Sequence, residues 1–245
     1  MPSEQQDVPL GYHAACEVVR VGYEAMFQGC EKLIPKASDL ASDEDNQTPQ
    51  FGFVGPRYAE TRVLVLGVNP GVVKRDKVKE RDQPSLDALR SFRDEPTPGK
   101  FLAAQAANRI ALESWRDENR HWKHLLARTS LTFDDIAFSN GLPWRTSTNE
   151  LSSQLQLHAA AYYAWPLVKE LAPRLVICFG CNAAQVFEPR RRRVRHPKDV
   201  RHGPPQPLPP HVVWRRSRKR TAEIERQNAS ALAQINATLN GRWAA

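Results

Sequence analysis

The sequence predicts an α/β fold: a three-layer α/β/α sandwich with a four-stranded parallel central sheet. The first observation is a set of four short apolar runs, each a candidate buried strand, at residues 63–66, 135–138, 175–179 and 211–214. The second is that segments with helical spacing separate these runs. Strands that alternate with helices are typical of a parallel sheet covered on both faces by its crossover helices.

The N-terminal half contributes the first two strands and four helices. Apolar residues recur at helical spacing from Tyr12 onward, and the alanine-rich stretch before Trp115 is typical of a longer helix. Between them, three prolines in a charged stretch leave room for only one short helix. The helices expected in this half lie at 11–35, 85–92, 101–115 and 122–127, with a polar, acidic loop over 36–50.

The C-terminal half contributes the other two strands and three helices. A helix over 150–171 is ended by Pro173, and a short helix begins near Asn182, just after the glycine that closes the third strand. A proline-rich stretch precedes the fourth strand, and a last helix is expected over 221–239. We expect one domain over 1–245, with an N-terminal helical extension at 1–50 and a basic, proline-rich insertion at 188–210.

Composition excludes several classes of protein. The 245 residues are 41% hydrophobic, enough for a packed core, but no window approaches the ~18 consecutive apolar residues of a membrane span. The polar start of the chain does not resemble a signal peptide. Four cysteines do not make a disulfide scaffold. We therefore expect a cytoplasmic protein without a membrane partner, and a monomer.

Positive charge is concentrated in one part of the chain. Residues 188–226 contain 13 lysines and arginines and 4 acidic residues, a local net charge of +9, whereas the whole chain carries +8. A basic patch on an otherwise balanced protein is typical of a partner that is a polyanion. A solvated basic loop is the alternative interpretation. Because this segment flanks a predicted strand, we favour nucleic acid as the partner.

Polar residues follow the ends of the predicted strands. Right-handed crossovers place the carboxyl ends of parallel strands at one edge, where open α/β sheets bind their ligands. We therefore expect Asn69, Asn140, Gly180 and the loop 215–220 to converge there.

The first strand runs into the turn Gly67-Val68-Asn69-Pro70-Gly71. This arrangement resembles the first active-site motif of the uracil-DNA glycosylase superfamily, and its Asn form is most similar to the mismatch-specific uracil/thymine-DNA glycosylases. The resemblance implies that Asn69 is catalytic and orients the attacking water, and that Gly67, Val68 and Pro70 line the base site. Because an amide cannot take a proton from the water, a slower enzyme than the Asp form is expected. A turn-capping role for Asn69 is the structural alternative.

The second strand runs into Asn140-Gly141-Leu142-Pro143-Trp144-Arg145. This resembles the family segment whose Asn reads the flipped base, since a side-chain amide offers both a donor and an acceptor. Trp144 and Arg145 are expected nearby, to stack on bases or to contact DNA phosphates. Family members also have a base-stacking aromatic after the first motif. Phe92 is expected in this role, with Phe53, Tyr58 and Phe101 as other candidates.

The loop after the fourth strand departs from the family pattern. Members usually carry His-Pro-Ser or a close variant there, whereas this chain has Arg215-Arg216-Ser217-Arg218-Lys219-Arg220. By position, Arg215 replaces the His that stabilises the leaving base, and Ser217 aligns with the motif serine. The other four residues are expected to bind the DNA backbone, and binding should weaken as salt rises.

No cofactor or metal is expected. Some superfamily members hold an iron–sulfur cluster on four cysteines, and Cys178 and Cys181 have a C-x-x-C spacing. However, Cys178 falls inside an apolar strand, and the spacing of Cys16 and Cys30 does not match the family's cluster.

The resemblance implies a monofunctional DNA glycosylase, which flips a base and hydrolyses its N-glycosidic bond to leave an abasic site. Two substrates stay open: uracil or a mispaired base in DNA repair, and a modified base such as glucosylated hydroxymethylcytosine in antiviral defence against phage. The rival interpretation is a catalytically inactive DNA-binding protein with the same fold. A weaker third is a hydrolase of free nucleosides, which would not need so basic a segment.

Overall fold

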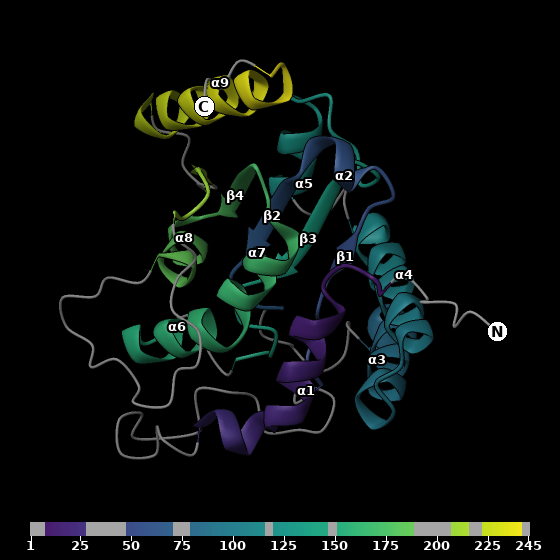
Figure 1. The fold of residues 1–245 in the computed structure, drawn as a ribbon. Helices are drawn as coiled ribbons and strands as arrows, with labels where there is room; N and C mark the ends of the chain where they lie inside the picture. The colour runs from purple at the N-terminus through teal and green to yellow at the C-terminus, as the bar shows by residue number, and fades with distance from the viewer. Residues whose placement is uncertain are drawn as a thin grey trace.

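The structure is a computed structural model that describes residues 8–27, 48–70, 79–115, 120–146, 151–188, 207–215 and 222–241. It has an α/β architecture (Figure 1). The strands are β1 (Phe53–Val54), β2 (Val63–Gly67), β3 (Ile136–Asn140), β4 (Leu175–Phe179) and β5 (His211–Trp214). The helices are α1 (Tyr12–Phe27), α2 (Tyr58–Thr61), α3 (Lys79–Asp94), α4 (Pro98–Trp115), α5 (Arg120–Leu126), α6 (Ser153–Ala159), the π-helix η2 (Ala160–Ala164), α7 (Trp165–Leu171), α8 (Cys181–Phe187) and α9 (Ala222–Leu239).

The five strands form one mixed sheet in the order β1-β3-β2-β4-β5. The four predicted strands are parallel to one another, as expected. The prediction of a four-stranded sheet was wrong, because β1 adds an antiparallel edge strand beside β3. Gly52 is required next to β1, since its φ is +76° and an added Cβ would lie 1.8 Å from the Phe138 carbonyl oxygen. A two-residue strand gives too little alternation to be recognised in a sequence.

Helices cover both faces of the sheet. On one face, Leu64 and Leu66 of β2 pack in a core with residues of α1, α7 and α8. On the other face, Val63 and Val65 pack with Trp122 of α5 and with α9. Because alternate residues of β2 are buried on opposite sides, the strand is apolar throughout, as its sequence indicated.

Two of the predicted helices have different bounds. α3 begins at Lys79, six residues before the expected start, and accommodates Pro84 near its N-terminal end. The expected helix over 150–171 begins after Ser152 and divides into α6, η2 and α7. The Ser152 hydroxyl caps its start by accepting the Leu155 N–H at 3.2 Å. Of the segment 188–210, residues 189–206 lie outside the described residues, as do 28–47 of the expected extension.

The N-terminal helix α1 is tied to the main body of the fold. The Glu170 carboxylate in α7 accepts the backbone N–H of Gly11 and of Ala14, each at 3.0 Å. The N–H groups of a first helical turn have no partner within the helix, and a carboxylate also suits the positive end of the helix dipole. The described part of the expected N-terminal extension is therefore an integral part of the packed fold.

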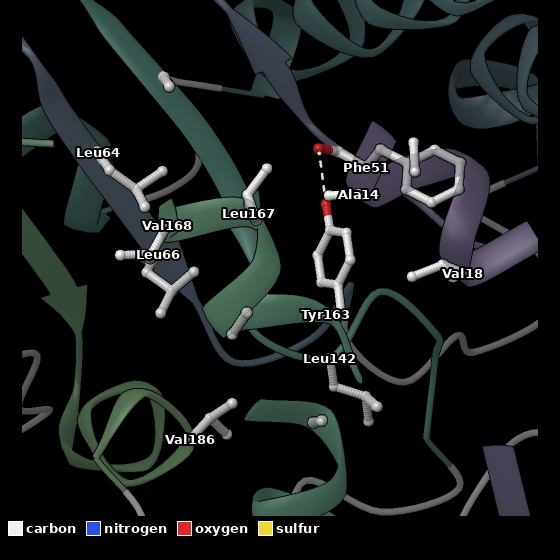
Figure 2. Close-up of a cluster of buried hydrophobic side chains, with 14 of the residues drawn as sticks. Ala14, Val18, Phe51, Leu64, Leu66, Leu142, Tyr163, Leu167, Val168 and Val186 are labelled. Atoms are coloured by element: carbon white, nitrogen blue, oxygen red, sulfur yellow. Dashed lines mark hydrogen bonds between the residues drawn. The ribbon is translucent and has the colours of Figure 1, made fainter. Parts of the chain in front are cut away.

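The π-helix η2 places Tyr163 under the end of β3. Its hydroxyl lies 2.8 Å from the Ser139 Oγ. It also donates to the Phe51 carbonyl oxygen at 3.3 Å, as Figure 2 shows. Burial raises the pKa of Tyr163 well above its ordinary value, so the hydroxyl stays protonated. The residue that precedes Asn140 is thus held by a buried hydrogen-bond network. A search of the described residues for a helix able to cross a membrane finds none.

Candidate functional site

The carboxyl ends of β3, β2, β4 and β5 lie in this order along one edge, which we call the carboxyl edge. Asn69, Asn140, Gly180 and Arg215 each lie at the end of one of these strands or within two residues of it. The expectation that they share one edge is confirmed for these four. Residues 216–220 of the same expectation lie outside the described residues.

The two Asn-bearing turns run side by side beyond the strands. Gly67 pairs with Asn140 at the end of the ladder between β2 and β3. Hydrogen bonds then continue the pairing: Gly141 N–H donates to the Gly67 carbonyl at 2.8 Å, and Leu142 N–H donates to the Val68 carbonyl at 2.9 Å. The backbone therefore brings Asn69 and Asn140 to neighbouring positions at the carboxyl edge.

Asn140 as a whole residue is only 7% exposed, no described residue forms a hydrogen bond with its side-chain amide, and the polar atoms of that amide still reach the surface. The amide lies over Gly67, where an added Cβ would be 2.4 Å from Oδ1, so a glycine is needed beneath it. Buried polar side chains nearly always have a hydrogen-bond partner, and an exception calls for an explanation. At the carboxyl edge, where ligands of such sheets bind, the natural explanation is a ligand that supplies the partner.

The Asn69 side chain is fixed at one of its two polar atoms. Its Nδ2 donates to the Thr146 hydroxyl at 2.6 Å, and both atoms belong to loops at the carboxyl edge. Its Oδ1 forms no hydrogen bond with any described residue. The side chain is partly exposed, so Oδ1 is an oriented acceptor that solvent can reach. Such an acceptor can hold a water molecule by one of its hydrogens.

Arg145 does not lie where a DNA contact was expected. Its side chain is only 6% exposed, and its guanidinium donates to the Pro70 carbonyl at 3.2 Å and forms an ion pair with Asp82 of α3 at 3.1 Å. A partner 63 residues away in the sequence draws this charge into the interior. Arg145 therefore fastens the loop after Asn69 to α3. Trp144 is also buried, which corrects its expected stacking role.

Phe92 was the wrong choice for a base-stacking aromatic. It is fully buried, and its ring packs against Phe51 and Phe101 at centroid distances of 5.6 and 5.3 Å. The helical spacing of Leu86, Leu89 and Phe92 along α3 already indicates a core face. The other candidates, Phe53, Tyr58 and Phe101, are buried as well.

Arg215 is described only at the start of the arginine-rich loop. Its backbone N–H donates to Asn228 Oδ1 at 2.9 Å, and its carbonyl accepts from Asn228 Nδ2 at 3.0 Å. The Asn228 side-chain amide in α9 thus pairs with both the backbone N–H and the carbonyl of Arg215, the residue that follows β5. The remaining expected contacts, Arg216, Ser217, Arg218, Lys219 and Arg220, lie outside the described residues.

The cysteines in the described part of the chain are free thiols at Cys16, Cys178 and Cys181. Cys178 is buried within β4, and desolvation raises its pKa to about 12, so it acts as an apolar core residue. No group of three or more His, Cys, Asp or Glu side chains among the described residues could hold a metal ion. Cys30, one of the four candidate cluster ligands, lies outside those residues.

Sequence reasoning missed three residues at this edge. Thr146 and Asp82 hold the Asn69 loop directly or through Arg145, and no local pattern distinguishes them from surface residues. Phe179, the last residue of β4, looked like part of an apolar strand but is only partly buried. The sequence did offer one signal for Phe179, because it is an aromatic residue directly before Gly180, the glycine that ends the strand.

Comparison with protein-family models finds no match, and comparison with curated proteins finds no significant one. Interpretation of the site therefore depends on its own chemistry. One amide can pair with both a donor and an acceptor on a planar group, and the other can orient water. Together they can bind a heterocycle and hydrolyse a bond beside it.

Proposed function

We propose that this protein is a monofunctional DNA glycosylase with a uracil-DNA glycosylase-like fold, most similar to the mismatch-specific branch of that superfamily. The unpartnered, buried Asn140 amide beside the oriented Asn69 amide is the observation that carries the proposal. The motif Gly67-Val68-Asn69-Pro70-Gly71 gives the same interpretation from the sequence. We further propose that the protein acts as a cytoplasmic monomer.

In the proposed mechanism, an extruded base pairs with Asn140 through its Watson–Crick edge. Asn69 Oδ1 accepts a hydrogen bond from a water and aims its oxygen at C1′ of the sugar, while Thr146 fixes the amide. The new bond joins that oxygen to C1′, and the glycosidic C–N bond breaks with its electron pair leaving on the base. The departing base takes up a proton, and the water loses one to solvent, because an amide is not a base.

The basic segment supports DNA rather than a free nucleoside as the substrate. Residues 188–226 carry a net charge of +9, and Arg215 of this segment lies at the carboxyl edge, where the Asn228 side chain holds its backbone. Lysines and arginines bind phosphates along a DNA backbone, and such binding weakens steeply as salt rises. A free nucleoside carries no phosphate and gains nothing from this charge.

Two kinds of target base fit the proposal. Uracil or mispaired thymine offers the imide edge that an amide can pair with. Alternatively, the arginine at position 215, where the family usually has a histidine, accords with a modified base such as glucosylated hydroxymethylcytosine in phage DNA. The first target implies a role in repair, and the second a role in defence.

The test incubates the protein with duplexes that carry uracil, a T·G mismatch or glucosylated hydroxymethylcytosine, followed by alkaline cleavage at abasic sites. We expect strand cleavage with one of them for the wild-type protein, and about 10²- to 10⁴-fold less for Asn69→Ala. DNA affinity should be unchanged by this substitution. Asn236→Ala, at an exposed position of α9, is the control and should retain full activity.

A catalytically inactive DNA-binding protein is the second candidate. It is favoured by the absence of the Asp and the His found in the fast members of the family, at positions 69 and 215. This candidate predicts tight binding without cleavage of any of the three duplexes, and no effect of Asn69→Ala on any measured property. That combination of results would replace the proposal of catalysis.

A further inference from the structure

Backbone pairing on the outer flank of β3 is interrupted next to Asn140. β1 has two residues, and its pairing with β3 ends at Phe138, which lies opposite Phe53. A backbone hydrogen bond forms again beyond the strand, where the Gln50 N–H donates to the Pro143 carbonyl at 2.8 Å. Asn140 lies within this interval, where contacts of another kind join β3 to the chain before β1.

Two buried hydroxyl groups provide those contacts. The Tyr163 and Ser139 hydroxyl oxygens lie 2.8 Å apart, a usual hydrogen-bond length, so one of them donates to the other. Each also has the Phe51 carbonyl oxygen as an acceptor, at 3.3 Å from Tyr163 and 3.2 Å from Ser139. Figure 2 shows the contact between Tyr163 and Phe51. The Ser139 oxygen also lies 3.4 Å from the carbonyl oxygen of Asn140, so this one side chain contacts both Phe51 and the backbone of Asn140.

The Tyr163 phenol is needed to complete this network, because the network has only two hydrogens, one on each hydroxyl. If Tyr163 donates to Ser139, the Ser139 hydrogen is left for a backbone carbonyl. If Ser139 donates to Tyr163, the phenol hydrogen goes to Phe51. Without the phenol, Ser139 keeps carbonyls as acceptors but loses the shortest contact of the network. The connection between β3 and the chain before β1 then depends on one longer hydrogen bond.

A π-helix brings this phenol into position. Tyr163 lies in η2, whose turn contains one more residue than an α-helical turn. Such turns are rare, and they occur frequently at functional sites. Tyr163 is 1% exposed, so its hydroxyl does not contact a ligand, and any part that it takes in function passes through its neighbours.

From this network we infer that Tyr163 is a positioning residue for Asn140. Its hydroxyl, acting through Ser139, fixes the end of β3 so that the Asn140 amide keeps its place over Gly67. The inference rests on the proposed function, in which Asn140 reads the extruded base. Because the peptide plane is rigid, a displacement of Ser139 is passed directly to the backbone of Asn140. The amide has little room to adjust, since an added Cβ on Gly67 would lie 2.4 Å from its Oδ1.

The experiment compares Tyr163→Phe with Tyr58→Phe, a matched control. Both substitutions remove only the hydroxyl of a buried tyrosine, and Tyr58 also donates to a backbone carbonyl, that of Leu171, at 3.1 Å. Tyr58 lies in α2, just before the start of β2 and therefore at the end of the sheet away from Asn140. Each variant should lower the melting temperature by about 2–4 °C, in line with the loss of one hydrogen bond. A purely structural role for Tyr163 predicts that the two variants behave alike in every other respect.

The first readout is the selectivity of DNA binding. Affinity is measured for a duplex that carries the target base on a 2′-fluorinated sugar, whose glycosidic bond resists hydrolysis, and for a duplex with a tetrahydrofuran abasic analogue. We expect Tyr163→Phe to lower the ratio of the two affinities about threefold to tenfold, the effect of one hydrogen bond, and Tyr58→Phe to preserve it. Ser139→Ala should lower the ratio as much. Adding Tyr163→Phe to Ser139→Ala should lower it no further, because both substitutions remove the same contact.

The second readout needs no DNA. The side-chain amide resonances of Asn140 are recorded in ¹⁵N-labelled protein and assigned by their loss in Asn140→Asp. They should shift in Tyr163→Phe, because the amide changes its position over Gly67, and stay in place in Tyr58→Phe.

The outcomes separate this inference from the proposed function. An unchanged ratio or unchanged Asn140 resonances in Tyr163→Phe would overturn the inference and leave the proposed function intact, and so would an equal response in Tyr58→Phe. If no base is excised but both readouts respond as expected, catalysis fails and the positioning role stands. A wild-type ratio of one for uracil, mispaired thymine and glucosylated hydroxymethylcytosine alike would overturn the proposed base site, and with it this role of Tyr163.

Discussion

Polar residues at the two edges of the sheet differ in their hydrogen bonding. At the edge where the parallel strands begin, which we call the amino edge, Asp135 forms an ion pair with Arg57 at 2.8 Å and accepts the Thr132 N–H at 2.7 Å. Asp134 beside it is paired with Arg109 of α4. At the carboxyl edge, by contrast, the amide of Asn140 and the Oδ1 of Asn69 form no hydrogen bond with any described residue.

This difference distinguishes stabilising polar groups from binding ones. Charged groups at the amino edge are satisfied by one another and stay at least partly in contact with solvent, so they contribute modestly to stability. Amides at the carboxyl edge are oriented by glycine, threonine and arginine neighbours, but the Asn140 amide and Asn69 Oδ1 keep their hydrogen-bonding capacity for a ligand. Substitutions at the two edges should therefore affect different measurements.

Gly67→Ala is expected to have the largest effect on activity. The new Cβ would be 2.4 Å from Asn140 Oδ1, so the amide must swing aside while the rest of the core is kept. We expect base excision to slow about 100-fold, equivalent to about 2.7 kcal/mol, with little change in melting temperature. Gly99→Ala in α4, where an added Cβ meets nothing within 4 Å, is the control and should be active. Normal excision by Gly67→Ala would show that the position of Asn140 is unimportant.

Arg145→Met is expected to slow excision about 30-fold, because it releases both Pro70 and Asp82 from the guanidinium. The Asp82 side chain is 20% exposed, so losing Arg145 should cost less stability than the about 3–5 kcal/mol of a fully buried ion pair. Single-turnover excision at saturating DNA, below the melting temperature, separates the two effects. If Arg145 acts through the Asn69 loop, the double variant with Asn69→Ala should be no slower than Asn69→Ala alone. Additive losses would indicate a general structural defect.

Asn228→Ala should affect DNA binding more than chemistry. It removes the amide that holds both backbone groups of Arg215, where the arginine-rich loop leaves β5. We expect DNA affinity to fall about threefold to tenfold, in line with the loss of two hydrogen bonds, and excision of bound DNA to continue at its normal rate. Ser230→Ala, an exposed position in α9, serves for comparison. A slower chemical step in Asn228→Ala would place this residue in the catalytic machinery instead.

Asp135→Asn at the amino edge should have the smallest effect, and only on stability. Partial burial works to raise the pKa of Asp135, but hydrogen bonds from Arg57 and Thr132 outweigh it and hold the pKa below its ordinary value. Its contribution to stability is therefore present above about pH 4 and lost as pH falls through the folded-state pKa. We expect the melting temperature to drop by about 1–3 °C at neutral pH, and the difference to vanish in acid. A loss of activity would contradict the comparison of the two edges.

Much of the fold could be predicted from the sequence because the three central strands, β2, β3 and β4, are buried on both faces and end at or just before a glycine or an asparagine. Those features place Asn69 and Asn140 at one edge without any knowledge of long-range contacts. β1 could not be predicted in the same way, since its two residues are defined by pairing with Phe138 and Ala137.

The errors at the site have a common physical cause. Arg145 was interpreted as a surface charge because its partner, Asp82, is distant in sequence, and only the fold brings the two together. Phe92 was predicted to stack on the base because it lies downstream of the motif, although helical spacing turns it toward the core. The position of Phe179 beside Gly67 was overlooked because it depends on the register of β4 against β2, which no single strand reveals.

The π-turn at Ala160–Ala164 has a consequence for how the chain tolerates change in length. It accommodates one more residue than an α-helical turn, and that surplus brings the Tyr163 hydroxyl to Ser139 and Phe51 (Figure 2). Deleting a single alanine there would leave an uninterrupted α-helix. It would also rotate the Tyr163 side chain by about 100° relative to the helix on the other side of the deletion. A gap of one amino acid at this point would therefore disturb the end of β3 more than many point substitutions on the surface.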